Sequence, residues 1–277
     1  MSGWRQCVGA LLCFTCLGLR SQANRIDSFR STLLNRTVKL ALHIPEPSAV
    51  ASFQQTHPGE RPTLVLFLPG LWDGPANLLD RGIFAELSRR EAAGARPALW
   101  VAVRNFHGWY ADRKKGNFPY ARFLMEELVP VLEARFQVGG SPAKRVVAGL
   151  SMGGFGALNL AARTEAFSRV LALSPALVEP PFRGSWLIRW SLRRVFEESP
   201  EAFAPWNPWR HLGGRADVRL ACGTSDGYGL APVTETFAQK RREAGLPVAL
   251  DLRPGGHDWH TWTPMILDNA SWLAGEP

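Results

Sequence analysis

The stretch Arg145-Val-Val-Ala-Gly-Leu-Ser-Met-Gly-Gly-Phe-Gly-Ala157 decides the fold of this chain. An apolar run enters Gly149-Leu-Ser-Met-Gly153 and small residues follow, which predicts a strand, a sharp turn and a helix. Glycines on both sides of Ser151 suit a turn so tight that side chains there would collide with neighbouring backbone. This pattern is typical of a nucleophile elbow, which exposes a serine at the carboxyl end of its strand.

Short apolar runs alternate with helix-forming segments along the rest of the chain. The predicted strands cover residues 37–44, 63–68, 98–103, 145–148, 169–173, 218–222 and 248–252. The predicted helices cover residues 85–93, 121–134, 154–162 and 233–244, and residues 45–59 are interpreted as a turn-rich connection. This alternation predicts a mainly parallel sheet with helices on both faces. Together with the nucleophile elbow it predicts the α/β-hydrolase fold.

A serine hydroxyl needs a base to remove its proton, and the fold places a histidine for this purpose after its last strand. Of the six histidines, only His257 and His260 follow the last predicted strand. The paired glycines before His257 let a loop return the imidazole to the elbow, so His257 is favoured over His260.

The histidine in turn needs a carboxylate that orients it. Asp226 follows the penultimate predicted strand and lies between the serine and the histidine in the chain, as the fold requires. Asp217 precedes that strand and would lie at the wrong edge of the sheet. Asp258 is a neighbour of the histidine and is interpreted as a turn cap.

Acyl transfer also needs two N–H donors for the oxyanion. The backbone of Met152, directly after the serine, provides one candidate. The run Leu66-Phe-Leu-Pro-Gly-Leu-Trp-Asp73 ends a strand in a glycine turn and makes the N–H of Leu71 the best second candidate, although a tight strand-to-helix connection would look the same.

Residues 177–212 interrupt the strand and helix alternation and are rich in aromatic residues, among them Trp186, Trp190, Trp206 and Trp209. The segment is predicted to be a helical insertion or cap above the carboxyl edge of the sheet. Its aromatics either pack on the core or line a substrate pocket, and Trp186 and Trp190 are the candidate substrate contacts.

The N-terminus has the layout of a signal peptide over residues 1–23: Arg5, an apolar stretch, and small residues at a cleavage site. The apolar stretch is shorter than the about 20 residues that span a membrane. We therefore expect a hydrolase domain over residues 24–277 that is secreted or periplasmic, with an uncleaved anchor as the alternative. Cleavage would leave Cys222 as the one cysteine, interpreted as a buried strand residue.

The formal net charge of +8 is scattered in short clusters, which argues against a nucleic-acid partner. The histidines are dispersed and the mature chain would have no pair of cysteines at ligand spacing, which argues against a metal site. The glycines after the serine lack the lysine of a phosphate-binding loop, so no cofactor is expected.

Four motifs together resemble the esterase family that includes esterase D, S-formylglutathione hydrolases, feruloyl and acetylxylan esterases and the mycobacterial mycolyltransferases. They are Gly149-Leu-Ser-Met-Gly-Gly-Phe-Gly-Ala157, Gly223-Thr-Ser-Asp-Gly227, Gly255-Gly-His-Asp-Trp259 and Glu126-Glu-Leu-Val-Pro130. The resemblance covers residues 37–272. It implies a triad of Ser151, Asp226 and His257 and an oxyanion hole at Leu71 and Met152.

This sequence departs from the family pattern in two ways. Pro69-Gly70 stands where many relatives have His-Gly or Asp-Gly, and the leader argues against the cytosolic formylglutathione branch. The expected activity is hydrolysis of a small-molecule or carbohydrate-linked ester through an acyl-enzyme. Transfer of the acyl group to a sugar or lipid alcohol is the alternative, and a non-catalytic binding protein is the third hypothesis.

Overall fold

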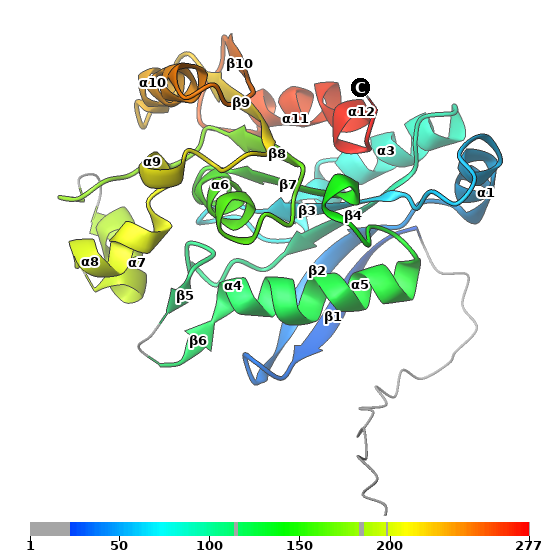
Figure 1. The fold of residues 1–277 in the computed structure, drawn as a ribbon, viewed down its shortest axis with the longest axis horizontal. Coiled ribbons are helices and arrows are strands. Elements are labelled where there is room, and N and C mark those ends of the chain that lie inside the picture. The colour runs from blue at the N-terminus through cyan, green and yellow to red at the C-terminus, as the bar shows by residue number, and fades with distance from the viewer. Residues whose placement is uncertain (1–22, 114–115, 183–185, 198, 277) are drawn as a thin grey trace, which may run out of the picture.

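The computed structural model describes residues 23–113, 116–182, 186–197 and 199–276 (Figure 1). In these ranges one sheet has the strand order β1-β2-β4-β3-β7-β8-β9-β10. The neighbouring pairs from β4 to β10 are parallel, whereas β1 with β2 and β2 with β4 are antiparallel. The strands are β1 (Asn24–Ser31), β2 (Arg36–His43), β3 (Thr63–Leu68), β4 (Ala98–Val103), β7 (Arg145–Leu150), β8 (Arg169–Leu173), β9 (Asp217–Gly223) and β10 (Val248–Arg253). A separate hairpin pairs β5 (Asp112–Arg113) with β6 (Phe118–Pro119).

Helices cover both faces of the sheet (Figure 1). One face packs against α4 (Tyr120–Arg122), α5 (Val129–Phe136), α6 (Met152–Thr164) and α10 (Leu230–Glu243), with a π-helical turn at Phe123–Leu128 joining α4 to α5. The other face packs against α3 (Ile83–Ala92), α11 (Trp259–Asp268) and α12 (Ala270–Leu273). The short helices α1 (Pro47–Thr56) and α2 (Asn77–Asp80) lie in connections.

The strand β3 shows how the sheet divides the core into two layers. Leu64, Leu66 and Leu68 pack in one hydrophobic cluster, and Val65 and Phe67 pack in the other, because successive side chains of a strand point to opposite faces. All of them are buried. A strand buried on both faces reads as a continuous apolar run, which is why the sequence predicted β3 with its observed bounds.

The α/β-hydrolase fold predicted from the sequence is confirmed, although some of its elements differ from the prediction. Residues 45–59 are not a turn-rich connection, because they contain α1. Pro47 stands in the first turn of that helix, where a missing N–H costs nothing, and Phe53 is buried beneath it. The antiparallel strand β1 and the helix α11, which contains Pro264, were not predicted. The predicted signal peptide lies outside the described residues, apart from Ala23.

The insertion between β8 and β9 is helical, as predicted. It contains α7 (Trp186–Phe196), α8 (Pro200–Phe203), a 3₁₀ turn (Ala204–Trp206) and α9 (Pro208–His211). Phe203 is buried and stacks on Phe155 of α6 with ring centroids 6.1 Å apart. The His211 imidazole is 3.0 Å from the side-chain oxygen of Asn159, also on α6. These contacts fasten the insertion to the helix that follows Ser151.

The turn between β7 and α6 is packed so tightly that it requires glycine. A Cβ atom on Gly153 would lie 1.7 Å from the carbonyl oxygen of Leu68, at the end of β3. A Cβ atom on Gly149 would lie 2.3 Å from the carbonyl oxygen of Gly153. Both obstacles are backbone atoms, which cannot move aside as the end of a flexible side chain can.

We therefore expect Gly153→Ala to lower the free energy of unfolding by about 3 kcal/mol or more, because β3 and α6 would have to separate. Urea unfolding curves of the two proteins measure the difference. Gly227→Ala is the matched control, since a Cβ atom there meets nothing within 4 Å. Equal stability of Gly153→Ala and the native protein would contradict this interpretation.

Candidate active site

Ser151 stands at the carboxyl end of β7 in a strained conformation, with φ 54° and ψ −117°. Its N–H donates to the carbonyl of Leu173 at 2.8 Å, and its carbonyl accepts from Ala176 at 3.0 Å. The turn is therefore bonded to the end of β8 on both sides. Strain of this kind persists only where the surrounding structure fixes it, and it gathers at functional sites.

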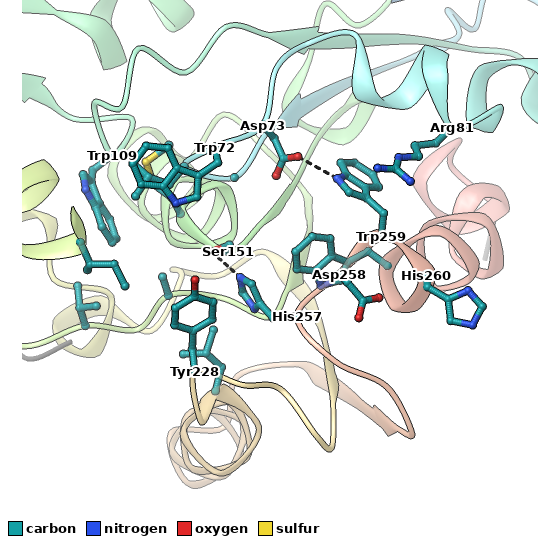
Figure 2. Close-up of a pocket in the computed structure, with 18 residues that line it drawn as sticks. Trp72, Asp73, Arg81, Trp109, Ser151, Tyr228, His257, Asp258, Trp259 and His260 are labelled. Carbon is teal, nitrogen blue, oxygen red and sulfur yellow. Dashed lines mark hydrogen bonds between the residues drawn. The ribbon is translucent and has the colours of Figure 1, made fainter. Parts of the chain in front are cut away.

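The structure brings Ser151, His257 and Asp226 into one hydrogen-bonded chain, of which Figure 2 shows the bond between His257 and Ser151. The Nε2 atom of His257 is 3.1 Å from the Ser151 hydroxyl, and its Nδ1 atom is 2.7 Å from Oδ2 of Asp226. Asp226 follows β9 and His257 follows β10, so both reach the serine from the same edge of the sheet. With Nδ1–H donating to the carboxylate, Nε2 is the acceptor that faces the hydroxyl.

The loops that carry Asp226 and His257 approach each other through a second glycine contact. A Cβ atom on Gly223 would lie 2.4 Å from the carbonyl oxygen of Gly255. The N–H of Ser225 donates to that same carbonyl at 2.9 Å. Gly255, one of the paired glycines that favoured His257 over His260 in the sequence, thus packs against Gly223 and allows His257 to lie beside Asp226.

The carboxylate of Asp226 is held in its charged form. Burial raises its pKa, but hydrogen bonds from His257 and from the N–H of Tyr228, at 3.0 Å, more than offset this and the pKa is lowered. Its side chain is fully buried, whereas the His257 side chain is 14% exposed. The carboxylate therefore faces the imidazole and not the solvent.

Two aromatic rings enclose the His257 imidazole. The ring centroid of Tyr228 lies 4.6 Å away and that of Trp262 lies 4.8 Å away, both in edge-to-face contact. The Trp262 indole N–H donates at 3.1 Å to Ser174, which also lies 3.5 Å from the thiol of Cys222. The imidazole is thus held laterally as well as through its two nitrogens.

Cys222 is a buried strand residue, as the sequence predicted. Burial raises the pKa of its thiol to about 11, so the thiol is neutral at physiological pH. It contacts Oδ2 of Asp226 at 3.8 Å from beneath the site and does not reach the cavity.

Leu71 and Met152 both border the space in front of Ser151. Met152 is the first residue of α6, so its N–H has no intrahelical acceptor. The Leu71 turn is fixed from two sides: the Tyr110 hydroxyl donates to the carbonyl of Pro69 at 2.7 Å, and the Asn105 amide donates to the carbonyl of Asp73 at 3.0 Å. Both N–H groups are therefore presented by well-supported backbone.

Asp73 joins this turn to the helix that begins after His257. Its Oδ1 atom accepts from the indole N–H of Trp259 at 2.8 Å and from Asn77 at 3.0 Å (Figure 2). Burial raises the pKa of this carboxyl group. The hydrogen bond from Trp259 is the largest of the effects that lower this pKa, but burial outweighs them. The sequence analysis did not find Asp73 or Trp259, although each lies within two residues of a predicted site residue.

A cavity of about 630 Å³ opens above Ser151 and His257, which is a size typical of small-molecule sites. Trp109 forms one wall, and its indole N–H donates to Ser191 of α7 at 3.0 Å. Ile188, one turn earlier on α7, also lines the cavity. Trp109 belongs to a run in which Phe106, His107, Trp109 and Tyr110 all have φ between 50° and 55°. No sequence signal predicted that backbone or the position of Trp109.

The structure corrects the prediction that Trp186 and Trp190 contact the substrate, because it does not bring either side chain to the cavity. Their side chains are 68% and 40% exposed, and the Arg194 guanidinium lies 4.7 Å from the Trp190 ring centroid. They lie on the faces of α7 that Ile188 does not occupy. A count of aromatics could not predict which face of the helix turns inward.

The competing residues lie where the sequence placed them. Asp258 caps α11, because its carboxylate accepts from the N–H of Thr261 at 3.0 Å. Asp217 begins β9 and so lies at the opposite edge of the sheet from the site. His260 lines the cavity but is exposed and points away from Ser151 (Figure 2).

Comparison with known proteins places the chain in a family. Residues 31–273 match the family model described as Putative esterase. The chain belongs to that family. It is 22% identical over 263 residues to an acetyl esterase of Caldicellulosiruptor saccharolyticus, covering 89% of this chain and 96% of that protein. The description of the family and the name of this relative support a carboxylic ester hydrolase.

Solved structures agree with the fold of this esterase. A ferulic acid esterase aligns with a TM-score of 0.70 and 27% identity, covering 91% of this chain and 97% of its own. An S-formylglutathione hydrolase from Agrobacterium tumefaciens aligns with a TM-score of 0.72 and 19% identity, covering 90% of this chain and 93% of its own. The second likeness is evidence for the fold alone.

Among the residues that the structure describes, no helix has the length and apolar character needed to cross a membrane. Within the same ranges, no three His, Cys, Asp or Glu side chains gather as a metal ion would require.

We predict that Ile188→Ala changes the ratio of kcat/KM between long and short acyl chains by about tenfold, because an apolar contact in the cavity is lost. Nitrophenyl esters of increasing acyl length measure the ratio. Trp186→Ala is the matched control on the exposed face of the same helix. A shift of the ranking by Trp186→Ala and not by Ile188→Ala would contradict the assignment of these two side chains.

Proposed function

We propose that this esterase is a serine hydrolase that acts through an acyl-enzyme at Ser151. The observation that carries the proposal is the hydrogen-bonded chain from the Ser151 hydroxyl through His257 to Asp226, which ends in an open cavity. A nucleophile, a base and a carboxylate in this order are the parts that ester cleavage requires.

In the first half of the reaction, the Ser151 oxygen attacks the ester carbonyl while its proton passes to Nε2 of His257. The carbonyl becomes an oxyanion, to which the N–H groups of Leu71 and Met152 donate. Collapse of this intermediate breaks the bond to the alcohol oxygen, which takes the proton from His257. The alcohol leaves and the acyl group remains on Ser151.

In the second half, water takes the place of the alcohol. His257 removes a proton from the water, whose oxygen attacks the acyl carbon and forms a second tetrahedral intermediate. The intermediate expels the Ser151 oxygen, which regains its proton from His257, and the acid is released. Asp226 remains charged throughout and stabilises the imidazolium twice per turnover.

We expect Ser151→Ala and His257→Ala to remain folded and to lower kcat on nitrophenyl acetate by about three orders of magnitude or more. His260→Ala should have a much smaller effect, since its side chain does not contact Ser151. Circular dichroism verifies folding, and a fluorophosphonate probe should label the native protein but not Ser151→Ala. Labelling of Ser151→Ala, or equal loss from the two histidine variants, would show that these roles are misassigned.

We further propose that residues 1–23 direct this esterase out of the cytoplasm, on the basis of the basic, apolar and small-residue segments in the sequence. Expression of the full chain in a bacterial host should then yield activity in the periplasm or medium. N-terminal sequencing of that product should begin near Asn24. Activity confined to the cytoplasm, on a chain that keeps its first residues, would refute export.

A further inference from the structure

The solvent-facing side of α7 carries tryptophan and arginine side chains that do not line the cavity. The opposite side is buried through Ser191, Leu192, Val195 and Phe196. The exposed positions follow the helical repeat, and we call them the Trp–Arg face: Trp186, Arg189, Trp190, Arg193 and Arg194. The helix contains no Asp or Glu. Large exposed rings that lie together on one helix face indicate a surface that contacts a partner.

The positive charge of this face continues onto the hairpin of β5 and β6, beside which α7 lies (Figure 1). The Arg194 guanidinium lies 4.7 Å from the ring centroid of Trp190. Burial lowers the pKa of Arg113 in β5, and the positive charges of Arg194 and of Arg36 in β2 lower it further. Guanidinium groups from three separate elements therefore lie within electrostatic reach of one another.

These guanidinium groups have no carboxylate partner in the part of the chain that the structure describes. Four arginines of the region form no ion pair with a described residue: Arg36, Arg104, Arg113 and Arg194. Arg36 and Arg113 lie over the Phe118 ring instead, 4.9 Å and 5.2 Å from its centroid. Because like charges repel, an anion that arrives from outside would stabilise this arrangement.

Trp72 connects the same region to the mouth of the cavity above Ser151. It lines the cavity, is 58% exposed, and has its ring centroid 5.5 Å from that of His107 (Figure 2). Burial lowers the pKa of His107, and the positive charges of Arg194 and Arg104 lower it further. The unpaired positive charge thus extends from α7 to the opening of the cavity.

We propose that the Trp–Arg face docks this protein on an anionic lipid surface. Tryptophan rings are enriched at the boundary between headgroups and acyl chains, and arginines are attracted to negatively charged headgroups. A small anion would pair with the arginines but leave Trp186 and Trp190 in water. An apolar partner would cover the rings but leave the arginines unpaired. An anionic lipid surface supplies both contacts at once.

This docking goes beyond the proposed function and does not depend on the chemistry of Ser151. Since Trp72 lies at the cavity mouth and beside His107, docking through α7 would turn that mouth toward the lipid surface. Single-stranded nucleic acid also binds through arginines and aromatic rings, and the test includes it as the competing outcome.

The test measures binding to vesicles of phosphatidylcholine alone and of an equal mixture of phosphatidylcholine and phosphatidylglycerol. Sucrose-loaded vesicles are sedimented, and the protein in the pellet and in the supernatant gives the partition coefficient. Native protein and variants are expressed and purified in the same way, so any effect of residues 1–23 on binding is common to all of them.

We expect the partition coefficient of the native protein to be about tenfold or more higher for the mixed vesicles, because arginines near the surface favour anionic lipid. Arg189→Gln together with Arg194→Gln should reduce this preference by about tenfold. Lys240→Gln together with Arg242→Gln, at the exposed end of α10, removes the same charge and is the matched control. The control pair should leave the preference nearly unchanged.

Trp186→Ala together with Trp190→Ala should lower binding to the mixed vesicles by about tenfold, because the rings no longer enter the interface. Brominated phosphatidylcholine in the same vesicles should quench the tryptophan fluorescence of the native protein more than that of this variant. Ile26→Ala, which truncates a 44% exposed side chain on β1, is the matched control for lost apolar surface. An unchanged rate on dissolved nitrophenyl acetate verifies that each variant is folded.

Three results would overturn the docking proposal. The first is equal binding of the native protein to the two kinds of vesicle. The second is an equal loss of preference in the control pair on α10, which would indicate attraction by net charge alone. The third is binding of a labelled single-stranded oligothymidylate without binding of vesicles, which would assign the face to nucleic acid. Fluorophosphonate labelling of Ser151 is unaffected by all three, so failure of the docking and failure of the proposed function are distinguishable.

Discussion

The close approach of α6 to the end of β3 is the constraint on which the site depends. Because Gly153 has no side chain, the first turn of α6 lies against the carbonyl of Leu68, where a Cβ atom would be only 1.7 Å away. Leu68 is the last residue of β3, and the Leu71 turn follows directly after it. One backbone contact therefore sets the serine, the N-terminus of its helix and the Leu71 turn in a fixed relation.

A second contact between glycines fixes the position of His257 relative to Asp226. The packing of Gly223 against the carbonyl of Gly255 brings together the loops after β9 and β10, which carry Asp226 and His257. Asp73 then connects the two assemblies, since its bond from Trp259 links the Leu71 turn to the helix behind His257. The geometry of the site thus depends on backbone packing as much as on the reacting side chains.

These constraints explain what the sequence could predict. Glycines that allow close contact are local signals, so the positions of Ser151, Asp226 and His257 at one sheet edge followed from motif and strand order. The lining of the cavity did not follow, because it depends on which face of α7 turns inward and on the left-handed backbone at Trp109. Ile188 lines the cavity while Trp186 faces solvent. This difference depends on how α7 is rotated about its axis, and the amino-acid composition does not determine that rotation.

Two separate parts of the chain build the cavity above Ser151. One part is Trp109 with α7, joined by the bond from the Trp109 indole N–H to Ser191, and the other is the turn after β3 with the start of α11, joined by the bond from Trp259 to Asp73. In the mechanism proposed above, the acyl group remains on Ser151 through both halves of the reaction, whereas the alcohol leaves after the first. On that mechanism, side chains that contact the acyl group can alter both halves of the reaction, while those that contact only the alcohol alter the first half alone.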